Sequence, residues 1–206
     1  MEVRALLTRM ETPIGSHIGN AHEVLEILDI LDGSGSWDTI SLIAMQGGHL
    51  LQMAGIVDTV EAGQMKILST LSDGSAKHHW DLMCESQGVT NEVINQMRDH
   101  LETGEHRFTL HSNIDGWVDD IDAMELAKVL SELGAGRSEL GQEIDHSVGA
   151  IINANVGTQV SEGDLILTVE HQNDELSEEI MTRLESCISV SASPISVPDR
   201  LIEVIK

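Results

Sequence analysis

The chain contains few aromatic residues and few cysteines, and both shortages limit what it can be. Aromatic residues make up 2% of the 206 residues, with one Phe, three Trp and no Tyr. A core must therefore be built from aliphatic side chains and Met. Cys84 and Cys187 are the only cysteines, too few for a disulfide framework or a cysteine-based metal site. We expect both to be buried free thiols, which is compatible with a reducing compartment.

Positive charge is also scarce. The sequence has 35 acidic residues against 11 Lys and Arg, which gives a formal net charge of -24. Such a chain repels nucleic acid and anionic membrane surfaces, so we predict neither as a partner. The acidic residues are expected to form a solvated surface. Weak binding of calcium or another divalent cation is the alternative, although no EF-hand spacing occurs.

Long apolar runs are absent as well. No segment reaches the roughly 18 apolar residues that a membrane-spanning helix requires. The first residues, MEVRALLTRMETP, lack the apolar stretch of a secretory signal. If Met1 is the true start, we therefore expect a soluble, cytoplasmic protein. Apolar residues still make up 41% of the chain, enough for a packed core.

The first half of the chain is predicted to be mainly helical. Val3–Thr8 has the composition of a short buried strand, and Met10–Gly19 that of a turn-rich loop. Apolar periodicity predicts helices at about 20–31, 36–54 (with Ser36 as a cap), 59–71, 75–87 and 91–101. Gly47 and Gly48 weaken the second helix, and we expect them to allow close contact with a neighbouring element.

The pattern changes near Gly104, where we place a boundary between a helical half and a mixed half. Strands are predicted at 107–111, 116–122, 148–155, 164–171 and 188–190, and helices at 123–133 and 174–185, before a tail punctuated by Pro. The turns between Gly157 and Gly163 resemble those of lipoyl-type barrel-sandwich hairpins. No Lys lies at the hairpin tip, so no attachment site for a swinging arm is predicted.

Several familiar kinds of site are not indicated. The 10 His residues contain no i, i+4 pair with a third ligand, so scattered surface positions explain them better than a zinc site. The glycine-rich stretch Leu133–Arg137 follows a helix, where the dipole disfavours anions, so it predicts a helix end rather than a phosphate loop. No Ser lies in a nucleophile elbow, and neither cysteine has an evident His partner.

Five groups of residues, in order along the chain, carry a family resemblance. They are Ala5–Met10 with Pro13–Gly15 and Gly19–Val24; Asp73–Ala76 with Met83 and Gln87–Gly88; Asp115–Val118 with Ile121–Ala123; Leu133–Arg137; and Ile144–Gly149 with Val156–Val160 and Gly163. Together they resemble the thymidine and pyrimidine nucleoside phosphorylase family, in its C-terminal part, over residues 3 to 206. The residues of these motifs are most similar to those of the animal members.

The resemblance implies an α/β fold in two parts. Residues 1–103 would be the later half of a large, helix-rich α/β domain, and residues 104–206 a C-terminal α+β, barrel-sandwich-like module. The family reaction is reversible phosphorolysis of a pyrimidine nucleoside to the free base and a pentose 1-phosphate. It makes phosphate a co-substrate, needs no organic cofactor, and is carried out by a homodimer. The family class is therefore pentosyltransferase.

The residues that perform this reaction do not occur in the sequence. In the family, phosphate and base are held by Lys-His-Ser/Thr-Gly-Gly, Ser-Gly-Arg-Gly, Ser-Lys-Lys and Asp-Val-Lys stretches, and none is present here. No catalytic or substrate-binding residue is therefore assigned. The segment Thr8–Glu26 lies well inside family members but near the start of this chain. We therefore expect a truncated chain that is inactive by itself.

One ligand site can be carried over in part. Bacterial family members bind a monovalent cation with two loop carbonyls and a Glu, and the resemblance places these at Ile14, His17 and Glu26. The other ligands are missing, so the predicted site is incomplete, and the alternative is a loop that only turns the chain. A second hypothesis for the whole chain is a noncatalytic scaffold or interaction protein, in which exposed edges promote dimerisation or self-association.

Overall fold

A computed structural model describes residues 2–137 and 140–205 of the chain, and these divide into two compact units. The unit formed by Met1–Arg9, Leu25–His100 and Arg200–Lys206 is called the helical unit. The unit formed by Met10–Val24 and Leu101–Asp199 is called the sheet unit. Helix α1 (Asn20–Leu31) contributes its first residues to the sheet unit and the remainder to the helical unit.

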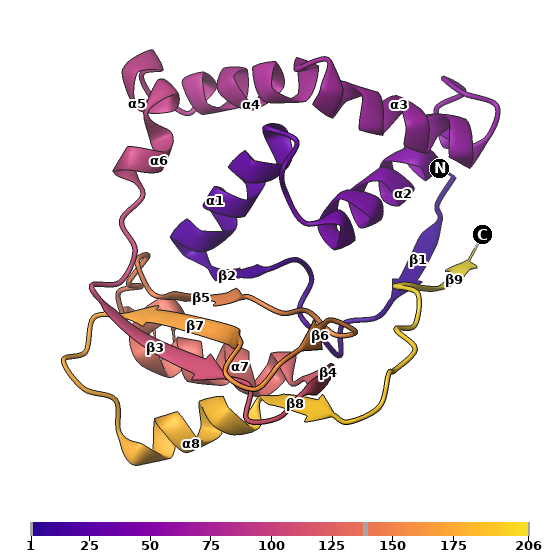
Figure 1. The fold of residues 1–206 in the computed structure, drawn as a ribbon. Helices are drawn as coiled ribbons and strands as arrows, with labels where there is room; N and C mark the ends of the chain where they lie inside the picture. The colour runs from indigo at the N-terminus through magenta and orange to yellow at the C-terminus, as the bar shows by residue number, and fades with distance from the viewer. Residues whose placement is uncertain (1, 138–139, 206) are drawn as a thin grey trace. The chain divides into compact units, whose positions relative to one another are not determined.

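The helical unit joins the two ends of the chain. Strand β1 (Ala5–Thr8) pairs antiparallel with β9 (Leu201–Ile205), so the indigo and yellow strands in Figure 1 lie side by side. The helices that follow α1 in this unit are α2 (Trp37–Met53), α3 (Val60–Ser72), α4 (Ser75–Ser86), α5 (Asn91–Asn95) and α6 (Met97–His100). On α2, the ring of His49 and the side-chain amide of Gln52 both contact Arg4. These contacts connect the segment before β1 to this helix.

Glycines bring α2 and α3 together. A Cβ on Gly48 would lie 2.6 Å from the carbonyl oxygen of Val60, and one on Gly63 would lie 2.7 Å from the Cα of Gly48. The expected close contact at Gly47 and Gly48 is thus confirmed, because only a residue without a side chain permits this approach. Few apolar side chains of the described helical unit are buried: Leu28, Ile30, Ala44, Cys84 and Ile94.

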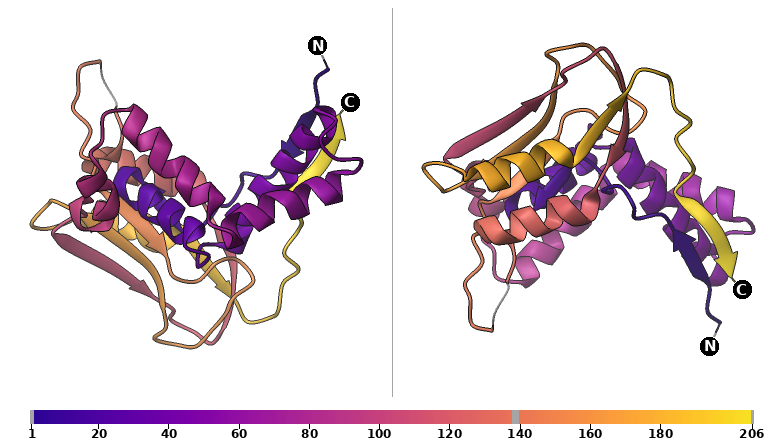
Figure 2. Two further views of the ribbon diagram at one scale, coloured as in Figure 1. Left: turned by 90° about the horizontal axis from the view of Figure 1, so that it is seen from above. Right: turned by 90° about the horizontal axis from the view of Figure 1, so that it is seen from below.

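The sheet unit contains two antiparallel sheets and two main helices. The first sheet has the order β2 (His17–Gly19), β5 (Gly149–Ile152), β7 (Leu165–His171) and β3 (His106–His111). The second has the order β6 (Gln159–Val160), β4 (Gly116–Ile121) and β8 (Ile188–Ser191). Helices α7 (Ala123–Leu130) and α8 (Glu178–Ser186) run side by side (Figure 2). A wide turn, η1 (Ser131–Ala135), ends α7.

A single buried cluster holds the sheet unit together. Its members come from α7, α8 and both sheets, and they include fully buried Leu126, Leu130, Leu167 and Leu184. Arg183 of α8 reinforces the helix pair, since its guanidinium donates to Glu125 at 2.6 Å and to Glu132 at 2.7 Å. Most of this cluster is aliphatic, as the shortage of aromatic residues predicts.

The mixed α/β fold class is confirmed, and so are the two buried free thiols. Several details differ from the predictions. The first strand is not buried: Leu7 is exposed, because β1 belongs to a sheet of only two strands. Ser36 precedes α2 but makes no side-chain capping bond, whereas Thr59 caps α3 by accepting from the Ala62 amide.

Two further predictions are corrected in the same way. The helix expected over 91–101 is divided into α5 and α6 at Gln96. The tail punctuated by Pro, for which no strand was predicted, contains β9, which pairs with β1. Within residues 2–137 and 140–205, no helix combines the length and the apolar character that a membrane crossing requires.

Candidate functional site

The loop predicted to bind a cation leads into β2 and α1. Ile14 lies in the loop, and His17 is the first residue of β2, where it pairs with Ile151 of β5. Glu26 is buried on α1. The structure places Ile14 and His17 in the sheet unit and Glu26 in the helical unit. The cation site therefore stays a prediction.

The start of α1 is fixed to the sheet unit by backbone and side-chain contacts. The amide of Ala21 donates to the carbonyl of His146 at 3.1 Å, and the Asn20 side chain donates to the carbonyl of Ala135 at 3.2 Å. Gly19 has a φ of 116° and passes so close to Val148 that a side chain would collide with its carbonyl. Only glycine adopts this conformation in this space without strain.

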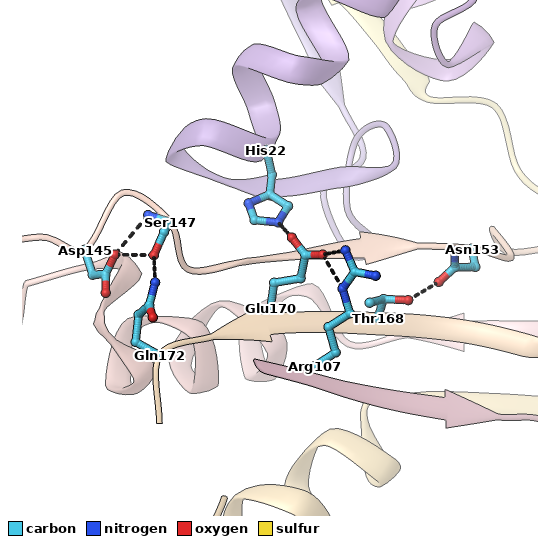
Figure 3. A network of polar contacts seen from close by, with 8 residues as sticks. All are labelled: His22, Arg107, Asp145, Ser147, Asn153, Thr168, Glu170 and Gln172. Carbon is cyan, nitrogen blue, oxygen red and sulfur yellow. Dashed lines mark hydrogen bonds and ion pairs between the residues drawn. The ribbon is translucent and has the colours of Figure 1, made fainter. Parts of the chain in front are cut away.

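Three charged or titratable side chains meet beneath this helix start (Figure 3). Nε2 of His22 on α1 lies 2.9 Å from Glu170 on β7, and both side chains are almost fully buried. The other carboxylate oxygen of Glu170 accepts from Nε and a terminal nitrogen of Arg107 on β3, at 2.8 and 2.7 Å. A buried carboxylate is tolerated because it is paired and hydrogen-bonded.

The surroundings set the charge of each member. Burial alone would raise the pKa of Glu170, but hydrogen bonds from Thr103 and His22, together with the charge of Arg107, lower it below its ordinary value. Burial lowers the pKa of His22 below 6.5, even though the contact with Glu170 acts in the opposite direction. At neutral pH, Glu170 is therefore ionised and His22 is neutral.

Two smaller polar groups flank this network on the same sheet. Asp145 accepts from the backbone and hydroxyl of Ser147, whose oxygen also accepts from Gln172 at 2.8 Å. Further along β7, the hydroxyl of Thr168 donates to Asn153 at 2.9 Å. These bonds satisfy the buried hydroxyls of Ser147 and Thr168, and those of the first group stabilise the loop before β5.

The arrangement supports fold stability more readily than chemistry. Among the described residues, no group of three or more His, Cys, Asp or Glu side chains could hold a metal ion. Burial raises the pKa of Cys187 to about 11, and the nearby charges of Glu125 and Asp122 add to this effect, so the thiol is a poor nucleophile. Glu170, the one deeply buried carboxylate of the network, is fully engaged by its partners.

Sequence reasoning did not identify His22, Glu170 and Arg107 as a group. One signal for them exists in the sequence. Glu170 lies in β7, whose other residues from Ile166 to His171 are also buried. A carboxylate in a strand buried on both faces requires a partner of opposite charge or a strong donor. The identity of that partner depends on pairing with β3 and packing of α1, which the local sequence does not reveal.

Comparison with known proteins adds evidence over the whole chain. Residues 117–191 match the family described as Pyrimidine nucleoside phosphorylase C-terminal domain. The thymidine phosphorylase of Rattus norvegicus is 35% identical over 214 residues, which covers 100% of this chain and 45% of the relative. The pyrimidine-nucleoside phosphorylase of Staphylococcus haemolyticus (strain JCSC1435) is 31% identical over 188 residues, covering 91% of this chain and 43% of the relative.

The human thymidine phosphorylase gives a similar result, with 32% identity over 100% of this chain and 44% of its own length. The chain thus spans less than half the length of these curated relatives. The part of each relative that it matches is the C-terminal part. By these matches, residues 117–191 resemble the pyrimidine nucleoside phosphorylase C-terminal domain, and the whole chain is similar to the C-terminal part of thymidine and pyrimidine-nucleoside phosphorylases.

Proposed function

We propose that this chain serves pyrimidine nucleoside phosphorolysis, the reversible conversion of thymidine or a related nucleoside and phosphate to a free base and a pentose 1-phosphate. The observation that carries the proposal is similarity over 100% of the chain to a protein named thymidine phosphorylase, at 35% identity. In this proposal the chain supplies the scaffold of the family's C-terminal part. Residues 104–206 form the C-terminal domain, and residues 1–103 form the later half of the α/β domain.

The chain by itself is proposed to lack meaningful turnover. The family's phosphate- and base-binding stretches do not occur in the sequence. Phosphate binding needs Lys, hydroxyl groups and backbone amides from glycine-rich loops. A net charge of -24 opposes the capture of an anion unless a basic pocket is present. Any monovalent cation bound through Ile14, His17 and Glu26 would support the loop rather than the reaction.

Two assays test the proposal. The chain is incubated with thymidine and phosphate, and free thymine is measured by chromatography; the expected result is no release above the uncatalysed background. Turnover at the level of an intact family member would overturn the inactive state. In the second assay, this chain replaces the matching C-terminal part of the rat thymidine phosphorylase. The chimera is expected to release thymine, whereas a folded chimera without activity would contradict the proposed role.

A noncatalytic interaction role is the second candidate, and exposed apolar side chains of the helical unit favour it. Trp37, Leu50 and Met65 are 66%, 66% and 71% exposed, and all lie on α2 or α3. Large apolar side chains that stay exposed to water are a feature of surfaces that associate with another protein. We propose self-association, including a homodimer, as the simplest form of this role.

Light scattering coupled to gel filtration tests the second candidate. Self-association predicts a mass above that of one chain, and replacement of Leu50 and Met65 by Ser should return the protein to a monomer. The matched control is replacement of Met124 by Ser. Met124 is exposed and lies in the sheet unit, so this change should leave the mass unchanged. A compact, stable monomer of the unmodified chain would count against this role.

A further inference from the structure

The first turn of α1 packs on the sheet unit through several contacts, and one of them is made by the buried, titratable ring of His22. Four features hold the first turn of the helix: the bonds from Asn20 and Ala21 to loop carbonyls, the bond between His22 and Glu170, and the packing of the His22 ring on Gly149. A Cβ at position 149 would collide with the ring and with the carbonyl of Ile18. Of these features, only the contact with His22 can change its charge in the physiological range.

Charged and titratable groups reach His22 from several elements. Glu170 on β7 contacts the ring directly, and Arg107 on β3 acts through that carboxylate. His17 on β2 adds a repulsive effect when it is protonated. On α1 itself, Glu23 accepts from the Gly19 amide at 3.3 Å. The pair with Glu170 is therefore the main electrostatic contact of His22.

The hydrogen bonds define which nitrogen of the ring carries the proton. Glu170 is ionised and can only accept, so Nε2 of neutral His22 donates to it. Nδ1 is buried and has no hydrogen-bond partner in residues 2–137 and 140–205. A second proton would have to reside on Nδ1, where a buried donor would face no acceptor beside Gly149.

We propose that His22, Glu170 and Arg107 form a pH-sensitive latch that holds the first turn of α1 on the four-stranded sheet at neutral pH and releases it on acidification. Release lets protonated His22 reach water, where both ring nitrogens find partners. The latch belongs to the sheet unit, and the helix that it holds continues into the helical unit.

The direction of the effect follows from linkage. The folded pKa of His22 lies below 6.5, so the open state binds a proton more readily than the latched state. The stabilisation is fully present above about pH 6.5 and is lost as the pH falls toward the folded pKa. Between these two values, the equilibrium constant for opening should rise about tenfold for each pH unit, and below the folded pKa it should level off.

A histidine NMR titration of the full chain measures the latch directly. The His22 ring is expected to be the Nε2–H tautomer at pH 7.5 and to titrate below 6.5. Buffers contain choline as the monovalent cation, so that cation binding by the predicted loop does not affect the result. Titration at or above 6.5, or the Nδ1–H tautomer at neutral pH, would overturn the proposal whether or not any variant folds.

Amide exchange tests release of the helix. In the unmodified chain, the protection factor of the Ala21 amide should fall about tenfold per pH unit between pH 6.5 and the folded pKa of His22, and then level off. His22→Gln keeps a donor for Glu170 but cannot titrate, so the pH dependence at Ala21 should largely disappear. His78→Gln, at an exposed position of α4, is the matched control and should retain it.

Buried His171 also has a lowered pKa, and the same variant separates its effect from that of His22. Burial lowers the pKa of His171, and the charge of His106 adds to the effect. His171 follows Glu170 on β7 and so points to the opposite face of the strand. Its contribution therefore remains in His22→Gln. If His22→Gln and the unmodified chain lose protection at Ala21 equally on acidification, the latch is refuted.

Discussion

The two units of the chain use the same kinds of apolar residue but bury them to different extents. In the sheet unit, side chains from α7, α8 and both sheets join in one continuous buried cluster. In the described helical unit, five helices and part of α1 enclose only a few buried apolar residues. Leu126 on α7 is 0% exposed, whereas Leu50 on α2 is 66% exposed. Burial of apolar side chains should therefore stabilise the sheet unit more than the helical unit.

This difference shows what an amphipathic pattern can and cannot establish. Periodicity predicts that a segment is helical, since one face is apolar. Burial of that face depends on a covering element, and α2 and α3 leave part of their apolar surface uncovered. The stability of the chain is therefore expected to come mainly from the sheet unit, while the helical unit keeps apolar surface available for association.

Truncation of a matched pair of leucines should give the largest contrast. Leu126→Ala removes a fully buried side chain and should cost about 2 to 5 kcal/mol in the free energy of unfolding. Leu50→Ala removes a side chain that already contacts water and should change it by less than about 0.5 kcal/mol. Urea unfolding followed by circular dichroism measures both. Equal losses would contradict the difference in burial between the two side chains.

Added methyl groups at two glycines should give a smaller contrast. Gly149→Ala places a Cβ against the His22 ring and the Ile18 carbonyl, so we expect a loss of about 1 to 3 kcal/mol. Gly47→Ala meets only the side chain of Ile67, which must shift, and a gain of about 1 kcal/mol in helix propensity offsets part of this cost, so we expect a smaller net loss. Thermal unfolding compares the two variants. A stable Gly149→Ala variant would contradict the close packing of α1 on β5.

An ion pair of the helical unit should have the smallest effect. Arg200 donates from Nε and a terminal nitrogen to Asp38 at 2.9 and 2.7 Å, beside the start of β9. Both side chains are partly exposed, so Asp38→Asn should cost only about 1 kcal/mol. Hydrogen exchange of the β1–β9 amides is the measurement, with faster exchange in the variant. Unchanged exchange would show that strand pairing does not depend on this contact.

The local sequence predicted most helices but not the long-range pairings. The helix over 20–31 agrees with α1, because its apolar spacing and the glycines around it are local signals. Strand β9 was missed because its partner β1 lies at the other end of the chain. Strands β2 and β6 are only three and two residues long, too short to show an alternating pattern. The latch was missed for a related reason, since His22 and Glu170 are separated by 148 residues.

The most direct test of the difference between the units uses the two natural cysteines. Cys84 is buried in the helical unit and Cys187 in the sheet unit, and burial raises the pKa of both thiols. Single-cysteine variants, Cys84→Ser and Cys187→Ser, are labelled with N-ethylmaleimide at increasing urea concentrations and analysed by mass spectrometry. Labelling in high urea corrects for differences in thiol chemistry. Cys84 is predicted to lose protection at a clearly lower urea concentration than Cys187; loss of protection at the same concentration, or first at Cys187, would contradict the account.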